Sequence, residues 1–571
     1  MALQKLYYVY GLDTSCFYTD EENVIEKRII HARVTRDKLN KIIAGSYTPK
    51  RIRRDDFKSQ KDYKVSCVEW CEKRTIRYNN LLRKIKKYIT EKKSLLKSLL
   101  RDNISMTRTV RKEKIITSDG IPLLKKRVSI FDSSLTRYFG LKERDFNEEI
   151  VIIKVYFFDV AESIVKNGFY MNGYKYKFFS ASAGQIRTKK LVAVREDLLN
   201  QYWNSLTAGL TIEKINKLGG MNINKFLAYL ALSNSATDLW RGFDIDKCIV
   251  VNDFENQITG TVDFIDEKTY DIQRVTQDLN FTQTDGCGMI LPELSKKNFM
   301  VRLPWVKGLL ASFDFIKFLK DNNCVGTVTD IYGDKHNIIE ENIQIIFTKS
   351  QFKMWKFFND WNEYQQNFKK YNCTAGICNL EEDEISNSVI NYQMIQTLSD
   401  LTDEEIKSLA KPNNSDIINL SKDLKTMLKV FGATNENYRK SNFQKCLEIY
   451  PELISDTYCR QTLKDLKVKL EKDLWSARFD IGGKYTFVVP DLYAFCEHLF
   501  LGIKNPKGIL ASNEVCCKLY ENGEKLDCLR SPHLYLEHCI RKNNTSIEWF
   551  NTNAIYISCK DMISRIVQCD K

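Results

Sequence analysis

Two basic residues, Arg302 and Lys307, stand in an otherwise apolar run, MVRLPWVKG at residues 300–308, which has the composition of a strand. Charged side chains are seldom buried without a partner, so this run indicates either a bound anion or contact with solvent. Lysine offers a compact point charge and arginine a planar fork, and both suit phosphate oxygens. We expect two cations that face a cleft and bind phosphates; the plainer alternative is two charges on an exposed strand face.

A glycine-rich turn precedes this run. Asp285 and Gly286 are followed by Cys287 and Gly288, and the run itself ends at Gly308. Glycine adopts positive φ at little cost, and it lets the backbone approach a ligand closely. We therefore expect the turn and Gly308 to contact the same ligand as the two cations.

A second candidate element is FFSASAGQIR at residues 178–187. Its small residues allow a close approach of the backbone. Gln185 and Arg187 lie two positions apart, so on a strand they would share one face. By itself this pattern is a weak sign of a binding surface.

Short β-branched runs surround the glycine-rich turn. They predict strands at residues 247–251, 260–265, 325–329 and 343–347, enough with the central run for a closed six-strand barrel over residues 247–349. Residues 350–474 are predicted to be mostly helical, with a capping box that joins Thr402 to Glu405 and a helix break at residues 411–415. Strands return from residue 476, and Asn522 with Gly523 predicts a hairpin between strands at 515–520 and 529–533.

The N-terminal region carries a long helical pattern at residues 67–104, with leucine and isoleucine at three- and four-residue spacings. Its other side bears lysine and arginine. The plainer interpretation is a solvated helix face; the alternative is a face that follows a nucleic-acid backbone.

Composition sets the broad class. The 571 residues are 43% hydrophobic and 12% aromatic, which favours a globular chain of several domains. The net charge of +14 favours a polyanionic partner. The sequence has neither a signal-peptide pattern nor a long uncharged apolar run, so we expect a soluble, cytoplasmic protein. The 17 cysteines are scattered, which favours reduced core residues over zinc ligands, and leaves metal chemistry to carboxylates.

Three motifs, in order along the chain, resemble a known family. They are the serine-alanine-serine element with Gln185 and Arg187, the turn at Asp285 to Gly288 with Arg302 and Lys307-Gly308, and Arg530-Ser531-Pro532. Together they resemble the two-barrel, single-chain RNA polymerases: the RNA-silencing RNA-dependent RNA polymerases and related phage enzymes. The resemblance covers residues 175–571 in patches.

The resemblance implies an α+β multidomain fold. It predicts a basic, largely helical N-terminal region (1–150), a mixed α/β segment (151–245), a first double-psi β-barrel (246–350), a helical connector (351–475) and an incomplete second double-psi barrel (476–571). The implied activity is templated RNA synthesis from nucleoside triphosphates (NTPs), with nucleic-acid template and RNA product as partners. A DNA template is favoured by the phage-like character of residues 247–265 and 556–567.

The same resemblance implies residue roles. Lys307 would contact the triphosphate or primer end, and Arg302 and Arg187 would hold phosphates. Gln185, Asp285, Gly286, Gly288, Gly308, Arg530 and Pro532 would line the substrate and nucleic-acid path. Asp570 would be the first ligand of the family's aspartate-x-aspartate-glycine-aspartate loop, which holds Mg²⁺. Met289 stands where silencing polymerases often have lysine.

The other aspartates of that loop do not occur in the 571 residues. We therefore expect this chain alone to be inactive as a polymerase and to bind little magnesium, with a second chain as one possible source of the missing part. Two alternatives remain open: a non-catalytic nucleic-acid-binding remnant of the fold, and a basic scaffold that binds protein.

Overall fold

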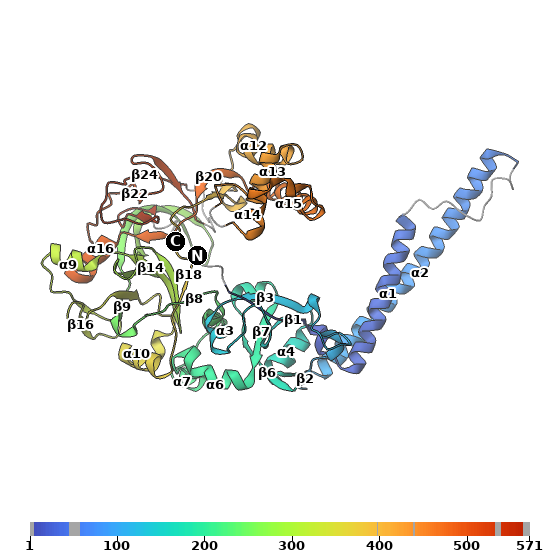
Figure 1. Ribbon diagram of the computed structural model, residues 1–571, viewed down its shortest axis with the longest axis horizontal. Helices are drawn as coiled ribbons and strands as arrows, with labels where there is room; N and C mark the ends of the chain where they lie inside the picture. Colours follow the sequence, from blue (N-terminus) through green and yellow to red (C-terminus); the bar gives the residue numbers. More distant parts are fainter. Residues whose placement is uncertain (1–4, 45–57, 397, 438–439, 531–537, 564–571) are drawn as a thin grey trace. The chain divides into compact units, whose positions relative to one another are not determined.

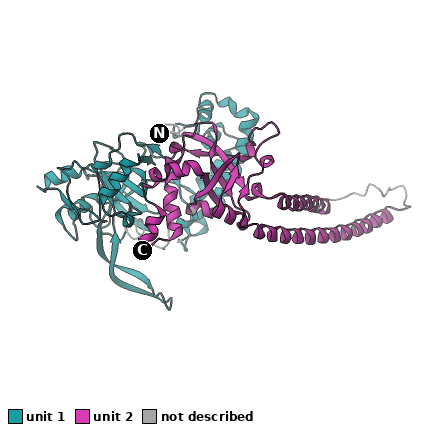
Figure 2. Ribbon diagram, turned by 90° about the horizontal axis from the view of Figure 1, so that it is seen from below, with its two compact units in different colours: residues 1, 208–210, 237–571 teal, residues 2–207, 211–236 magenta. Residues whose placement is uncertain are grey.

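The computed structural model describes residues 5–44, 58–396, 398–437, 440–530 and 538–563. The chain divides into two compact units, one of residues 2–207 with 211–236, the other of residues 208–210 with 237–571 (Figures 1 and 2). Helices and sheets occur in both, so the predicted α+β class is confirmed. No described helix is both long enough and apolar enough to span a membrane.

The first unit is built on a seven-stranded sheet, here the N-terminal sheet, with strand order β2-β5-β6-β7-β4-β1-β3. Its strands are β1 (Leu6–Asp13), β2 (Arg108–Thr109), β3 (Arg127–Phe131), β4 (Phe146–Lys154), β5 (Phe169–Met171), β6 (Tyr174–Ser180) and β7 (Lys190–Arg195). Its shorter helices are α3 (Ser134–Tyr138), α4 (Phe158–Asn167), α5 (Ala183–Arg187), α6 (Glu196–Thr207), α7 (Ile212–Lys217) and α8 (Ile223–Leu230). The boundary predicted after residue 150 falls inside β4, which pairs with both β1 and β7.

Two long helices, α1 (Asp20–Ala44) and α2 (Gln60–Asp102), leave this sheet as an antiparallel pair, here called the arm (Figure 1). Buried Leu82, Ile89 and Leu96 follow one another at seven-residue intervals on α2. They pack in the coiled-coil manner against an apolar seam of α1. The long N-terminal helix predicted from the sequence is therefore present, and it begins seven residues earlier than expected.

The second unit contains a seven-stranded mixed sheet, here sheet I, in the order β8-β18-β13-β14-β12-β17-β9. Its strands are β8 (Asp238–Leu239), β9 (Cys248–Val251), β12 (Cys287–Ile290), β13 (Phe299–Leu303), β14 (Val306–Ser312), β17 (Ile345–Thr348) and β18 (Gly376–Cys378). A closed six-strand barrel over 247–349 was predicted; instead β8 and β18, from outside that range, extend the sheet beyond β13, and no pair between described residues joins β8 to β9.

Smaller elements complete this part of the chain. A two-stranded ribbon of β10 (Glu255–Ile265) and β11 (Ile272–Thr282) follows β9, and α9 (Phe315–Asp321) follows β14. A short hairpin of β15 (Thr327–Thr329) and β16 (Lys335–Asn337) precedes β17, and α10 (Trp361–Lys370) lies between β17 and β18.

The connector is helical, as predicted. It comprises α11 (Tyr392–Ile395), α12 (Asp403–Asn419), α13 (Leu424–Phe431), α14 (Asn442–Ile449) and α15 (Thr457–Trp475), beside a two-stranded pairing of β19 (Asn387–Val389) and β20 (Asp480–Lys484). The capping box of Thr402 and Glu405 begins α12. The helix break predicted at 411–415 is wrong: α12 continues through Pro412, and the Asn413 side chain accepts a hydrogen bond from the Asp480 N–H (3.0 Å).

A five-stranded sheet, here sheet II, closes the described chain, with α16 (Leu492–Leu501) packed beside it. Its strands are β21 (Val488–Pro490), β22 (Glu514–Cys517), β23 (Lys525–Cys528), β24 (Cys539–Asn543) and β25 (Ile555–Ile557) in the order β21-β25-β22-β24-β23. The predicted hairpin through Asn522 and Gly523 is wrong, since β22 pairs with β24 and β25, not with β23. Buried residues of both sheets form one hydrophobic core.

Candidate phosphate-binding site

Arg302 and Lys307 lie on two neighbouring strands, not on the single strand that their spacing suggested. β13 ends at Leu303, Pro304 and Trp305 form the turn, and β14 returns antiparallel. Trp305 takes a positive φ of 64°, which reverses the chain within two residues. Arg302 and Lys307 are paired directly opposite each other in the ladder. The turn therefore places the two cations side by side.

A third cation, Lys353, belongs to the same cluster. The segment after β17 runs back along the turn. The backbone N–H of Lys353 donates to the Trp305 carbonyl (2.9 Å), and the backbone N–H of Lys307 donates to the Gln351 carbonyl (3.0 Å). Burial, then Arg302 and Lys353, lower the pKa of Lys307. Burial also lowers the pKa of Lys353, although Asp285 and Asp253 act in the opposite direction. Lys307 is exposed and Lys353 is half-buried. Three like charges placed this close together favour a bound anion.

Arg302 is half-buried on β13, the strand between β14 and β18 in the sheet. One terminal nitrogen donates to the Val301 carbonyl (2.7 Å), while its Nε is buried without a hydrogen-bond partner in the described part of the chain. Burial lowers the pKa of Arg302. A buried donor without a partner is costly, so a bound acceptor such as a phosphate oxygen would relieve that cost.

The glycines contact the protein's own Gln351. The Gln351 Oε1 accepts from the Thr348 N–H (2.9 Å), and its Nε2 donates to the carbonyls of Leu309 (2.9 Å) and Gly286 (3.4 Å). A Cβ at Gly288 would stand 2.6 Å from Gln351 Oε1, and one at Gly308 would stand 2.6 Å from the Gly286 carbonyl. Gly288 and Gly308 therefore make room for Gln351, a role that differs from the predicted close approach to a ligand.

A polar network fixes the turn that carries Asp285 and Gly286. The Gly286 N–H donates to the Ser350 hydroxyl (2.7 Å), which donates to the Asp253 carboxylate (2.6 Å). The Thr284 hydroxyl also reaches that carboxylate (3.2 Å). Burial raises the pKa of Asp253. Asp285 itself is exposed, and Gly286 has a φ of +71°, as the turn prediction required.

Gln185 and Arg187 were predicted to share a strand face, and this is wrong. Both lie on the short helix α5. Ser182 caps that helix: its hydroxyl accepts from the Gln185 N–H (3.3 Å), and the Gln185 side chain accepts from the Ser182 N–H (2.8 Å). A serine followed three residues later by glutamine is a helix-start pattern that the strand interpretation overlooked. Arg187 is exposed in the last turn, and both residues belong to the first unit.

The remaining predicted residues lie at the end of the chain. Arg530 is half-buried just after β23, whereas Pro532 and Asp570 lie outside the described residues. Within the described ranges, no cluster of three or more histidine, cysteine, aspartate or glutamate side chains is arranged to hold a metal.

The chain is similar to known proteins over the region that contains these elements. A family model described as RNA dependent RNA polymerase matches residues 127–540, well over half of the chain. The chain belongs to this polymerase family. Among its relatives is the protein named DNA-directed RNA polymerase YonO, from Bacillus phage SPbeta, which is 43% identical over 575 residues. That match covers 100% of this chain and 63% of the relative, so the chain spans less than two thirds of the length of this family member.

Sequence reasoning missed two residues of this candidate site. Lys353 and Gln351 follow β17 in the run TKSQFK, where neither residue type nor spacing marks a function. Only the pairing of this segment with the turn at Trp305 brings them to Arg302 and Lys307. A possible signal was the number of glycines nearby, because closely placed glycines indicate that some other group needs the space.

Proposed function

We propose that this chain is part of a nucleic-acid-templated RNA polymerase, which adds NTPs to the 3′ end of RNA. The observation that carries the proposal is the cluster of Arg302, Lys307 and Lys353, gathered from β13, β14 and the segment after β17. Membership of the family and the 43% identity to a protein named as an RNA polymerase support it. The cluster suits a triphosphate, whose charge needs several cations at once.

We further propose that sheets I and II each belong to one double-psi β-barrel, with domain limits near those expected from the sequence. Both sheets mix parallel and antiparallel pairs in one strand order, and both contribute to a single core. Their common core would hold the two halves of a site at a fixed distance, which a two-barrel polymerase needs.

In this proposal Lys307 and Lys353 bind phosphates of the incoming nucleotide or of the RNA end, and Arg302 donates its buried Nε to a phosphate oxygen. The partly buried setting strengthens these contacts because the local dielectric is lower than in water. Mg²⁺, held in the family by an aspartate loop to which Asp570 would belong, would lower the barrier to attack of a 3′-hydroxyl on the α-phosphate. Arg187 and Arg530 would contact the nucleic acid.

We propose DNA as the template, because the relative that matches the whole chain is named as a DNA-directed enzyme. The name of the matching family model points instead to an RNA template. Supplying either single-stranded DNA or single-stranded RNA of the same sequence distinguishes the two.

The test combines a binding and an activity measurement on a double variant, Lys307→Met with Lys353→Met. Lys335→Met, at an exposed site on β16, is the control. Binding of a fluorescent NTP to the 571-residue chain should weaken at least tenfold in the double variant, since each charged contact contributes about 1.5–3 kcal/mol. Templated incorporation by the polymerase that contains this chain should fall likewise. Unchanged binding and incorporation would contradict the proposal.

A further inference from the structure

The arm carries much of the positive charge of the protein. Helix α2 holds thirteen lysines and arginines against five acids. At about 100° per residue, six of these cations lie within about 120° of the helix surface. This basic stripe consists of Arg83, Lys86, Lys87, Lys93, Lys97 and Arg101, with Thr90 and Ser94 in the gaps. It covers roughly 27 Å of helix at 1.5 Å per residue.

The cations of the stripe are not neutralised by neighbours. Across the residues for which the structure gives side chains, none of the six forms an ion pair, although lysines elsewhere pair with acids at 2.6 to 2.8 Å. All six side chains are exposed. Glu91 is the acid of this segment, and by the same helical geometry it falls outside the stripe. The stripe thus presents unopposed charge to solvent.

The buried seam of α2 lies beside the stripe, about a quarter turn from its centre. Ile85 and Leu99 flank the seam of Leu82, Ile89 and Leu96, and this seam packs against α1. A helix that lies on a membrane needs an apolar face free to enter the lipid. Here the seam is buried against α1 and is not available to lipid, whereas Leu81, Tyr88 and Leu95 are exposed on the side away from the stripe.

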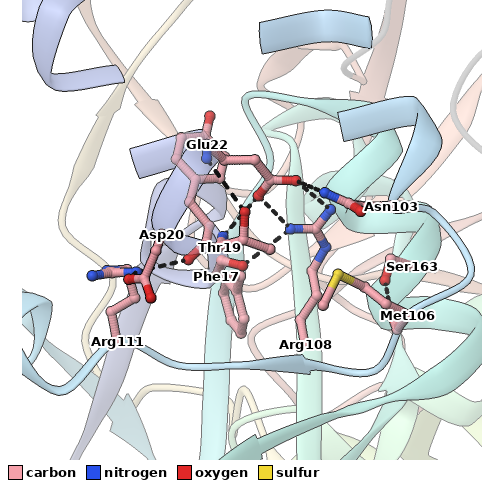
Figure 3. Close-up of polar contacts among 10 residues, drawn as sticks. Phe17, Thr19, Asp20, Glu22, Asn103, Met106, Arg108, Arg111 and Ser163 are labelled. Atoms are coloured by element: carbon pink, nitrogen blue, oxygen red, sulfur yellow. Dashed lines mark hydrogen bonds and ion pairs between the residues drawn. The ribbon is translucent and has the colours of Figure 1, made fainter. Parts of the chain in front are cut away.

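The root of the arm is held by a buried ion pair (Figure 3). Glu22, in the first turn of α1, accepts two hydrogen bonds from Arg108 of β2 (2.8 and 3.3 Å), and both side chains are fully buried. Glu22 also accepts from the side chain of Asn103, at the end of α2 (2.9 Å). One carboxylate therefore joins both helices to the sheet, which fixes the direction of the arm within its unit.

We propose that the arm binds the phosphate backbone of a nucleic-acid duplex along the basic stripe. A duplex carries about one charge per 1.7 Å of its axis, so a stripe of six cations on a straight helix can neutralise several phosphates without reading bases. This inference rests on the proposed function only in that the duplex would be the polymerase's own template or product. It concerns a surface in the other unit from Lys307.

The test uses the full chain and a fluorescent 30-base-pair DNA duplex, with the dissociation constant measured over a series of salt concentrations. The arm variant carries Arg83→Gln, Lys86→Gln, Lys93→Gln and Lys97→Gln. The control removes the same charge from exposed sites of the connector, by Lys407→Gln, Lys422→Gln, Lys464→Gln and Lys469→Gln. Each lost phosphate contact lowers the slope of log affinity against log salt by about 0.9. We expect a decrease of about 3 to 4 in the arm variant and of less than about 1 in the control.

A photo-crosslinking amino acid at Ser94 gives a second measurement that leaves the charges in place. It should crosslink to the duplex, whereas the same group at exposed Ser415 on α12 should not. An equal decrease of slope in both charge variants, or equal crosslinking from both positions, would overturn the proposal. Nucleotide binding separates this result from the site in sheet I: the arm variant should bind NTP normally, and the Lys307→Met, Lys353→Met variant should keep the full salt slope.

Discussion

Sheets I and II share one arrangement of five strands, but they differ in the charged and polar side chains at equivalent positions. Five strands of sheet I, in chain order β9, β12, β13, β14 and β17, occupy the positions of β21, β22, β23, β24 and β25 in sheet II. The corresponding pairs also agree in direction, parallel or antiparallel, all along the two sheets. The chain has therefore built one arrangement twice, and differences between equivalent positions can be compared directly.

A residue a few positions after the last of these strands shows the clearest difference. By register, Gln351 of sheet I corresponds to Asp561 of sheet II. Asp561 accepts from the Asn513 N–H (2.6 Å) and forms two hydrogen bonds with Arg541 (2.6 and 2.7 Å). Gln351 reaches the equivalent positions, which are glycines: Gly286 in place of Asn513 and Gly308 in place of Arg541. Gly286 and Asn513 even share a positive φ, 71° and 66°.

This difference determines where charge is left over. In sheet II an arginine meets its carboxylate inside the protein: burial alone would lower the pKa of Arg541, but Asp561 raises it. In sheet I the neutral amide of Gln351 takes the place of the Asp561 carboxylate, so it offers no negative charge to Arg302, Lys307 or Lys353. The positions of Arg302 and Lys307 in sheet I are occupied by Asp527 and Ile540 in sheet II. In sheet I, therefore, the residue at this position supplies no counter-charge to the cations.

The largest effect is expected from breaking the ion pair of sheet II. Asp561→Asn leaves Arg541 in a nearly buried position without its counter-charge, and such a loss typically costs about 3–5 kcal/mol. Urea unfolding of the chain, followed by intrinsic fluorescence, measures it. The double change Arg541→Met with Asp561→Leu removes both charges and should cost clearly less. Equal losses in the two variants would mean that packing, not charge, holds this position.

A smaller effect is expected from filling the space that Gln351 uses in sheet I. Gly308→Ala places a methyl group against the Gln351 side chain and the Gly286 carbonyl. Overpacking of this kind costs about 1–3 kcal/mol, again by urea unfolding. Gly184→Ala, on α5 with open space around its Cβ, is the control and should be neutral or slightly stabilising. If both variants unfold alike, the glycine requirement of sheet I is not steric.

The smallest effect is expected in the pH dependence of NTP affinity. The pKa of Lys307 and that of Lys353 are lowered, so both lose their protons below the ordinary lysine range near about 10.4. NTP affinity should therefore decline as pH rises through the lowered pKa values, while Lys307→Arg with Lys353→Arg should extend the plateau to higher pH. The free energy of unfolding should change in the opposite sense and rise with pH over this window, because the unfolded lysines bind protons more tightly. A flat affinity profile for the unmodified chain up to the ordinary lysine range would refute the lowered values.

The sequence predicted local features well when one pattern had one structural meaning. The capping box at Thr402, the long helix of α2 and the positive φ at Gly286 are examples. Prediction from the sequence failed where one pattern is compatible with two different structures. The run at 300–308 reads as one strand, but Pro304 and Trp305 divide it into two. The pair Gln185 and Arg187 suits a strand face until Ser182 is recognised as a cap.

The candidate site was predictable only in part, for a similar reason. Arg302 and Lys307 stand out because cations in an apolar run are unusual. Lys353 and Gln351 act through contacts with segments 42 to 65 positions away in the chain, and nothing in the neighbouring sequence indicates these contacts. The correspondence of Gln351 with Asp561 has no sequence signal either, since an amide and a carboxylate serve the same position.

The root of the arm has a consequence for how this protein can vary. Glu22, Asn103 and Arg108 fix both ends of the helical pair beside the sheet, so the part beyond them contributes nothing to that anchor. Seven residues removed from α1 and seven from α2 would keep the repeat of Leu82, Ile89 and Leu96 in phase. Insertions and deletions can therefore lengthen or shorten the arm in steps of two helical turns without changing the sheet that anchors it.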